Sequence, residues 1–331
     1  MTRTASTDQT LRRFDVCNGD ADGLCAVLQW RLAEPAVATL VTGLKRDIDL
    51  LGRVPVDAVD EVLVCDLSMQ RNQAALQRLL DASVRVHYFD HHAAGRVPQH
   101  AKLNAHIDPS SELCTSLLMD RHLGGRFRAW ALVGAYGDNL TRVADALAVS
   151  IGLDAEQRAA LRRLGEAINY NAYGDEDSDV HMAPARLFEI MARYPDPLQL
   201  LAHEPVAAEL DRLRRGDLQL AAEVAPYWHS ESACVYLLPD MPWSRRVIGC
   251  LANELARANP GQSHAVLKIL KSGDYVVSVR APQSAAGGAD ALCASFGGSG
   301  RAGAAGIDRL PAKDVERFIL AFGAANWTAP R

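Results

Sequence analysis

The sequence contains no long hydrophobic run. Among its 331 residues there is no stretch of about 18 apolar residues, so no segment is expected to span a bilayer. The seven cysteines form no Cys-x-x-Cys pair, which argues against thiolate metal sites and disulfide-stabilised secreted folds. The polar start, residues 1–14, carries no apolar segment of the type that directs secretion. These absences predict a cytoplasmic protein with small buried cysteines, among them Cys17, Cys25, Cys65 and Cys114.

The sequence also lacks an excess of basic charge. It has 35 Lys and Arg residues against 40 Asp and Glu residues, a formal net charge of −5. Proteins that bind long duplex DNA tightly neutralise many phosphates with basic side chains, so that class of protein is not favoured. The composition still permits a small phosphate-bearing ligand held by a few local Arg and Lys side chains.

Strand-like and helical segments alternate along the first part of the chain. Apolar runs at residues 14–17, 37–41, 62–65, 84–89 and 103–107 are predicted strands. Helical spacing of apolar residues predicts helices at 23–33, 72–81 and 111–122. This alternation predicts a mostly parallel sheet with helices on both faces. His87 is expected to be packed within its strand, whereas His106 is expected in a loop.

From about residue 128 the pattern becomes helical, and a second α/β pattern begins near residue 230. It comprises a strand at 233–238, a helix at 245–258, a hairpin of 265–270 with 275–280, and a helix at 313–322. Between this hairpin and the helix at 313–322, the glycine-rich segment 287–306 is predicted to be a functional loop. The predicted architecture is therefore α/β: a first domain at residues 1–185, a helical linker at 186–229, and a smaller α/β domain at 230–331.

Acidic and histidine side chains follow three of the predicted strands. Because the carboxyl ends of parallel strands share one edge of a sheet, these side chains are expected to converge there. Converging carboxylates raise one another's pKa, and divalent ions relieve the repulsion. Oxygen and imidazole donors without a thiolate favour manganese or magnesium over structural zinc. Unrelated exposed turn residues are the alternative interpretation. The candidate residues are Asp20, Asp22, Asp66, Asp90, His91 and His92, together with Asp138 at the end of a later apolar run.

These motifs resemble those of the DHH phosphoesterase family, and the resemblance covers nearly the whole chain. It is carried by Asp20-Ala21-Asp22-Gly23, Val64-Cys65-Asp66, Asp90-His91-His92, Gly134-Ala135-Tyr136-Gly137-Asp138 and the glycine-rich residues 296–306. The last motif is similar to that of the substrate-binding domain that often follows a DHH domain. The resemblance implies that residues 1–185 form a metal-binding catalytic domain and that the active site lies in a cleft between the two domains.

The resemblance also implies a role for each matched residue, with one or two Mn²⁺ or Mg²⁺ ions bound per chain. Asp66 would bridge two ions and Asp20 would hold the first. The second ion would be completed by Asp22, His91 and Asp138. His92 would contact the scissile phosphate, and Asp90 would orient the histidine pair, which fixes the ring tautomers.

The sequence departs from the family pattern beside the first ion. The family usually has a histidine at the position of Val16, and its exonuclease branch often has an acid at the position of Asn18. The first ion therefore lacks a ligand. The carbonyl oxygen of Asn18 or a water could replace that ligand, and an ordinary turn residue is an equal alternative for Asn18.

A second group of candidates lies in the glycine-rich domain. Backbone amides of Gly297, Gly298 and Gly300 are expected to surround a phosphate or nucleotide, because glycine lets the backbone approach an anion closely. A flexible linker is the alternative. Arg301 stands where the family usually has histidine and keeps a cationic phosphate contact. Arg280 matches an arginine that is common in this domain.

The predicted function is metal-dependent hydrolysis of a phosphate ester in a short oligonucleotide, a dinucleotide or a nucleoside bisphosphate. Two alternatives stay open. The first is a nucleotide-binding protein that has lost catalysis, which the apolar Val16 suggests. The second is a pyrophosphate or polyphosphate hydrolase. A homodimer is compatible with the sequence, and no membrane partner is expected.

Overall fold

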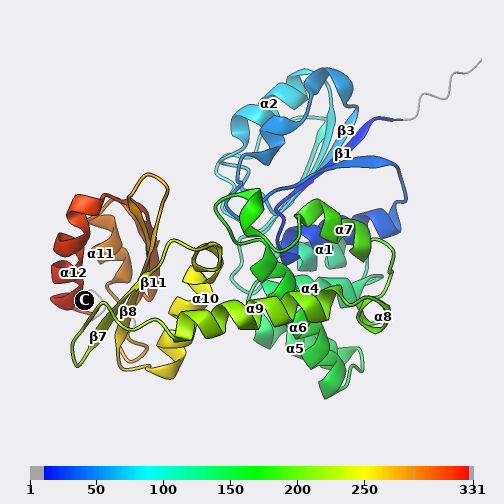
Figure 1. Ribbon diagram of the computed structural model, residues 1–331. Helices are drawn as coiled ribbons and strands as arrows, with labels where there is room; N and C mark the ends of the chain where they lie inside the picture. The colour runs from blue at the N-terminus through cyan, green and yellow to red at the C-terminus, as the bar shows by residue number, and fades with distance from the viewer. Residues whose placement is uncertain (1–10, 286, 328–331) are drawn as a thin grey trace, which may run out of the picture. The chain divides into compact units, whose positions relative to one another are not determined.

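The structure is a computed structural model that describes residues 11–285 and 287–327. Residues 1–10, most of the polar start considered above, lie outside this description. The chain divides into two compact units, Met1–Arg212 and Leu213–Arg331, and each unit has its own sheet (Figure 1). The dividing point falls inside helix α9 (Val206–Ala222). The predicted α/β class is confirmed.

The first unit is built on a five-stranded sheet in which every neighbouring pair of strands is parallel. The strands, in the spatial order β2-β1-β3-β4-β5, are β1 (Arg13–Cys17), β2 (Ala38–Val41), β3 (Glu61–Cys65), β4 (Arg85–Asp90) and β5 (Leu103–Ile107). Because β2 and β3 lie on opposite sides of β1, the strand order reverses between β1 and β3. In open parallel sheets, ligands bind at the carboxyl ends of the strands beside such a switch point.

Helices cover both faces of this sheet, as the sequence predicts. Neighbouring residues of a strand point to opposite faces, so Val16 and Cys17 belong to different hydrophobic clusters. Val16 packs in the cluster that includes helix α2 (Gln73–Asp81), and Cys17 packs with helix α1 (Ala21–Ala33). Cys25, Cys65 and Cys114 are buried too, as predicted.

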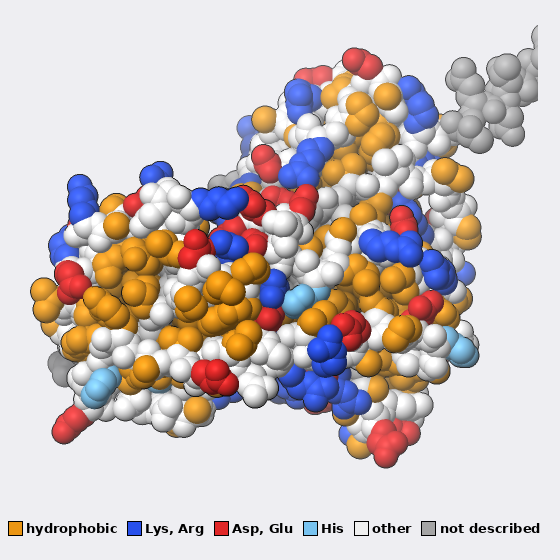
Figure 2. Space-filling view, viewed as in Figure 1, with side chains coloured by type: hydrophobic (Ala, Val, Ile, Leu, Met, Phe, Trp, Pro, Cys, Tyr) orange, Lys and Arg blue, Asp and Glu red, His pale blue; other side chains and the backbone are white. Residues whose placement is uncertain are grey.

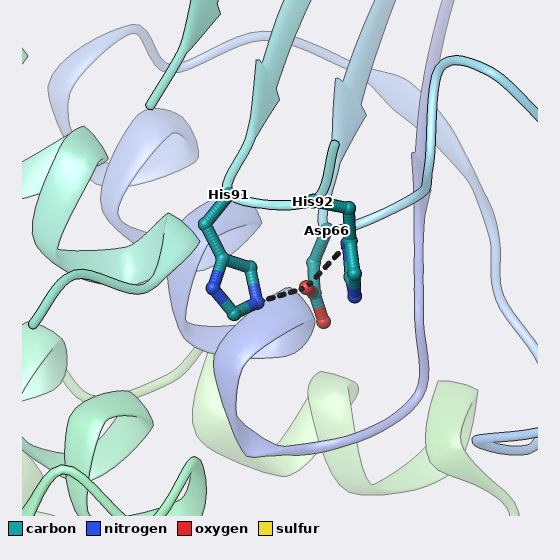
Figure 3. A group of neighbouring side chains, drawn as sticks. All are labelled: Asp66, His91 and His92. Carbon is teal, nitrogen blue, oxygen red and sulfur yellow. Dashed lines mark ion pairs between the residues drawn. The ribbon is translucent and has the colours of Figure 1, made fainter. Parts of the chain in front are cut away.

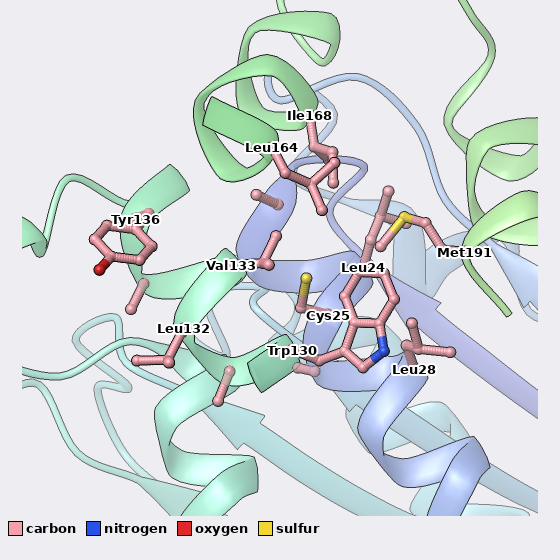
Figure 4. Packing of buried hydrophobic residues seen from close by; sticks show 14 of the residues in the cluster. Leu24, Cys25, Leu28, Trp130, Leu132, Val133, Tyr136, Leu164, Ile168 and Met191 are labelled. Carbon is pink, nitrogen blue, oxygen red and sulfur yellow. The ribbon is translucent and has the colours of Figure 1, made fainter. Parts of the chain in front are cut away.

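A layer of helices packs around α1. It comprises α3 (Thr115–His122), α4 (Arg128–Gly137), α5 (Thr141–Ser150), α6 (Ala155–Asn171), α7 (Pro184–Met191) and α8 (Pro197–His203). Figure 4 shows Leu24 of α1, Val133 of α4 and Leu164 of α6 in one core. A side chain at Gly137 would meet the Cβ atom of Ala21 at 2.4 Å, so glycine is required for this approach. The close packing brings the carboxyl end of α4 to the amino end of α1.

The second unit contains a mixed six-stranded sheet in the order β10-β11-β9-β8-β7-β6. Its strands are β6 (Trp228–His229), β7 (Ala233–Leu238), β8 (Ser263–Ile269), β9 (Tyr275–Arg280), β10 (Ser299–Arg301) and β11 (Ala304–Leu310). Its own helices are α10 (Pro242–Ala258), α11 (Ala289–Ala294) and α12 (Val315–Gly323). The predicted hairpin is confirmed, since β8 and β9 pair antiparallel.

Two predictions about local structure are wrong. The helix expected from residue 111 begins at Thr115, because a buried carboxylate binds the first amides of α3. The glycine-rich segment 287–306 is not an open loop: α11 and the β10–β11 hairpin lie within it. Gly298 serves packing, since a Cβ atom there would lie 2.2 Å from the carbonyl oxygen of Gly306.

The face of the molecule shown in Figure 2 agrees with the absence of a strong basic field. On the face shown in Figure 2, Lys and Arg side chains form small groups with Asp and Glu among them, and no continuous basic band crosses this view. Within residues 11–285 and 287–327, no helix combines the length and apolar character needed to cross a bilayer.

Candidate metal centre

Asp66 lies at the switch point of the sheet, directly after β3. Its backbone φ of +57° falls in the left-handed region, which aspartate tolerates better than most residues. The backbone N–H donates to the carbonyl oxygen of Phe89 on β4 (3.0 Å). This bond fixes the turn, and the Asp66 side chain is buried at the carboxyl edge of the sheet. An unusual backbone angle at such an edge is typical of functional residues.

Asp22 is held by the start of another helix. It lies in the first turn of α1 and is only 1 % exposed. Its two carboxylate oxygens accept the backbone N–H groups of Thr115 and Ser116, each at 2.7 Å. These are orphan donors at the amino end of α3, so each group satisfies the other. The Asp22 carboxylate is therefore fixed in position.

His91, just beyond β4, presents one ring nitrogen to three carboxylates. Its Nδ1 lies 3.1 Å from the carbonyl oxygen of Leu113, which can only accept, so Nδ1 carries the proton and Nε2 faces the acids. Nε2 lies 3.5 Å from Asp66 Oδ1, 3.9 Å from Asp138 Oδ2 and 4.0 Å from Asp22 Oδ2. The structure thus brings together four of the predicted residues, and Figure 3 shows His91 and His92 beside Asp66.

The charges of this cluster are unbalanced without an added cation. Burial and the charges of Asp20 and Asp22 raise the pKa of Asp66 well above its usual value. Burial and the charge of Asp22 raise the pKa of Asp138 to about 6. Burial disfavours a charged His91, yet its hydrogen bond to Asp66 and the surrounding carboxylates raise its pKa to about 10. The cluster therefore retains protons that a divalent ion would displace.

The donor set fits such an ion. Two ligands held about 2.1 Å from one octahedral ion lie about 3.0 Å apart when adjacent and about 4.2 Å apart when opposite. All three distances from His91 Nε2 fall within that range. Carboxylate oxygens and one imidazole suit manganese or magnesium. Ligand atoms of Asp66, His91 and His92 also lie within 4.8 Å of one another.

Asp90 contacts only one member of the histidine pair. Its Oδ1 lies 2.7 Å from His92 Nδ1, which leaves His92 Nε2 as the ring atom available to a ligand. The side chain of His92 is 48 % exposed, whereas Asp90 is fully buried. Asp90 Oδ2 has no hydrogen-bond partner within the described part of the chain. The expectation that Asp90 orients both rings is corrected, since the Leu113 carbonyl holds His91.

Asp20 has a partner that the sequence analysis missed. As the N-cap of α1 it accepts the N–H of Gly23 (3.1 Å), and its Oδ2 lies 2.5 Å from Lys45 Nζ. Burial opposes ionisation of Asp20, but the charge and hydrogen bond of Lys45 outweigh it and lower the pKa of Asp20. Lys45 follows β2, whose carboxyl end lies at the same edge as those of β1 and β3. The position of Lys45 shortly after the second strand is the sequence signal that indicates a basic residue at this edge.

The two positions that depart from the family pattern lie at the end of β1, shortly before Asp20 in the sequence. Val16 is fully buried in an apolar cluster and offers no ligand atom. Asn18 is 8 % exposed, and its Nδ2 donates to the carbonyl oxygen of Lys45 (3.3 Å). Its Oδ1 is buried and lacks a hydrogen-bond partner among the described residues. Asn18 is therefore a structural neighbour of Lys45 as well as a source of one oxygen.

The candidates in the second unit are built into its fold. The N–H groups of Gly297 and Gly298 donate to the carbonyls of Ala294 and Cys293 at 3.0 and 2.8 Å. The expectation that these two amides contact a phosphate is therefore wrong, and Gly300 lies in edge strand β10.

The two predicted arginines lie in one row of this sheet. Arg301 on β10 is opposite Ala304, which is opposite Arg280 on β9. Arg301 is exposed, whereas Arg280 donates to Asn253 Oδ1 and Ser278 Oγ. Of the two side chains, Arg301 is the more accessible to a phosphate.

Comparisons with known proteins agree with this architecture. No family model matches the chain, and no curated protein sequence matches it. Among solved structures, a DHH domain from a protein described as belonging to a family of ribosomal proteins aligns with a TM-score of 0.66 and 14 % identity, covering 95 % of this chain and 86 % of that one. Exonuclease RecJ bound to manganese aligns with a TM-score of 0.61 and 17 % identity, covering 96 % and 90 %.

A third similar structure is the pGpG-specific phosphodiesterase PggH of Vibrio cholerae, with a TM-score of 0.54, 14 % identity, and 95 % and 100 % coverage. All three alignments span nearly the whole of this chain, including both units. The chain therefore has the fold of the DHH-domain proteins, which its sequence motifs predict.

Proposed function

We propose that this protein is a metal-dependent phosphoesterase that acts on short oligonucleotides or small nucleotides. The observation that carries the proposal is the position of His91 Nε2, within 4.0 Å of carboxylate oxygens of Asp22, Asp66 and Asp138. The three acids come from different elements: α1, the end of β3 and the end of α4. Such convergence of three acids, two of them buried, on one imidazole has little structural benefit without a cation.

Each residue of the site has a distinct proposed role. Asp22, Asp66, His91 and Asp138 would bind a divalent ion, Mn²⁺ or Mg²⁺. An ion held there neutralises phosphate oxygens and lowers the pKa of a bound water. His92, held by Asp90 and half-exposed, would contact a phosphate oxygen through its Nε2 side. Arg301 would hold a second part of the substrate through its planar, bidentate guanidinium group.

The class of substrate is supported by two similar structures and by the charge of the chain. One is an exonuclease, and another is described as specific for the linear dinucleotide pGpG. A net charge of −5 does not favour long duplex DNA. A short strand, a dinucleotide or a nucleoside bisphosphate is compatible with these similar structures and with the net charge.

A catalytically inactive nucleotide-binding protein is the second candidate. Two observations favour it: Val16 offers no ligand atom, and the Lys45 ammonium already neutralises Asp20. This candidate would bind a nucleotide without metal-dependent turnover.

A turnover screen with manganese distinguishes these functions. The full chain would be incubated with a short RNA, a linear dinucleotide, a nucleoside 3′,5′-bisphosphate and pyrophosphate, with a chelator as control. Release of mononucleotide or phosphate that the chelator abolishes supports the proposal. Turnover of pyrophosphate alone would identify a pyrophosphatase, and nucleotide binding with no turnover would favour the inactive protein.

A further inference from the structure

Lys45 is built into the edge of the sheet rather than attached to the surface. Its N–H donates to the carbonyl oxygen of Ala172 (2.9 Å), and its own carbonyl oxygen accepts from Asn18 Nδ2 (3.3 Å). Its ammonium lies 2.5 Å from Asp20 Oδ2 and 3.0 Å from Asn169 Oδ1. Backbone and side chain are thus fixed on both sides, with the positive charge directed at Asp20.

The two ends of the acidic cluster have different charge balances. At one end, the single carboxylate of Asp20 is matched by the single ammonium of Lys45. At the other end, Asp22, Asp66 and Asp138 surround one imidazole. A divalent ion would offset two of the three negative charges in the second group. An ion beside Asp20 would have to displace the ammonium or lie close to it, and like charges at such distances repel strongly in a buried site.

Two neighbouring residues fit the same interpretation. Val16 offers no donor, and Asn18 is uncharged and uses its amide to hold the Lys45 backbone. The Asp20 end therefore has one carboxylate of its own beside the neighbouring Asp66, no histidine ligand and a resident cation. This set of groups binds an ammonium well and a divalent ion poorly.

We propose that the Lys45 ammonium takes the place of one of the two metal ions, so that the chain binds a single divalent ion at Asp22, Asp66, His91 and Asp138. This inference rests on the proposed metal-dependent function. Asp20 then acts as a positioning residue for Lys45 and is not a metal ligand. An ammonium has three N–H groups; Asp20 and Asn169 accept two of them. The third can donate to a phosphate oxygen, which gives the site a fixed cation that does not dissociate.

Metal content tests this inference without any measurement of activity. The full chain would be equilibrated with MnCl₂, its bound manganese counted by elemental analysis, and the ion positions located by anomalous scattering in crystals. The wild-type chain is expected to hold one Mn²⁺, with the Asp20–Lys45 contact intact. Lys45→Ala is expected to hold a second Mn²⁺ beside Asp20, and Lys45→Arg is expected to hold one.

Arg46→Ala is the matched control, since it removes a neighbouring cation whose partner is Asp175; it should hold one ion. Two ions in the wild-type chain, or one ion in a folded Lys45→Ala chain, would overturn the inference. The wild-type count decides the question even if the alanine variant does not fold. The proposed phosphoesterase function fails separately, by an absence of turnover in a chain whose manganese content has been measured.

Discussion

The two sheets of this protein use their polar groups in different ways. At the carboxyl edge of the first sheet, buried acids face one another and an imidazole, and burial raises the pKa of Asp66 well above its usual value. In the glycine-rich part of the second sheet, the N–H groups of Gly297 and Gly298 are already bonded to carbonyls. In the first region the carboxylates repel one another, and a bound cation would reduce this repulsion. In the second region these two amides are satisfied by the fold, so a partner would bind through other groups, such as exposed side chains.

The largest expected effect is on turnover, from Asp66→Asn. Asparagine has nearly the same shape and tolerates the left-handed backbone angle, so the fold should persist. Turnover should fall by several orders of magnitude, because the central carboxylate of the metal site is lost. Manganese-dependent hydrolysis of a dinucleotide, measured beside Asp81→Asn on the exposed face of α2, provides the comparison.

Thermal unfolding of the same variant separates lost chemistry from lost structure. In the presence of a chelator, Asp66→Asn should be at least as stable as wild type, because it removes one of the mutually repelling carboxylates. Excess manganese should stabilise wild type, by about 2.7 kcal/mol at a hundredfold excess over Kd, and leave the variant nearly unchanged. Wild-type turnover in the variant would refute the central role of Asp66.

The second prediction concerns substrate capture by Arg301. Loss of a charge-assisted hydrogen bond costs about 1.5–3 kcal/mol, or roughly 10–150-fold. If the contact is equal in the ground and transition states, Arg301→Ala should raise KM by that factor and leave kcat unchanged. Arg309→Ala, on neighbouring strand β11 and paired with Asp274, is the control. A fall in kcat at constant KM would instead place Arg301 in the chemical step.

The third prediction tests whether the glycines of the second unit serve packing. A Cβ atom at Gly298 would lie 2.2 Å from the carbonyl oxygen of Gly306, whereas one at Gly303 would meet nothing within 4 Å. Gly298→Ala should therefore destabilise the chain by about 1–3 kcal/mol, and Gly303→Ala by less than about 0.5 kcal/mol. Urea unfolding measures both. Equal stability of the two variants would show that the hairpin yields without cost and that Gly298 is retained for another reason.

The predictable parts of the site follow from topology. Parallel strands place their carboxyl ends on one edge, so the positions of Asp66 and His91 could be predicted from strand patterns alone. The position of Lys45 after β2 could be predicted in the same way, but its pairing with Asp20 could not, because that depends on how the turn after β2 contacts Ala172 and Asn169, far along the chain. The prediction of a functional loop at the glycine-rich segment failed for a related reason. Glycine permits both close ligand contact and close backbone packing, and only the pairing of β10 with β11 decides between these two roles.

His106 is expected in a loop, but it lies in β5, the strand predicted at residues 103–107, where it stacks on Phe89 with ring centroids 4.5 Å apart. His122 contacts the same two rings, at centroid distances of 4.9 Å from His106 and 5.1 Å from Phe89. His87 lies close to the group through Trp30, with Glu61 3.7 Å from its Nε2 atom. This histidine cluster provides the smallest predicted effect.

Burial and the charge of His122 lower the pKa of His106, and burial likewise lowers the pKa of His87 despite Glu61. The unfolded chain therefore binds protons near pH 6.5 that the folded chain does not yet bind, so these histidines reduce stability as the pH falls. The raised pKa of Asp138 acts in the opposite sense, so the dependence must be measured as a difference. His106→Phe keeps the stacking on Phe89 and removes the titration. The stability of wild type relative to this variant, from urea unfolding, should decline between about pH 7.5 and about pH 5.5. A difference that does not change with pH would show that His106 is protonated equally in both states.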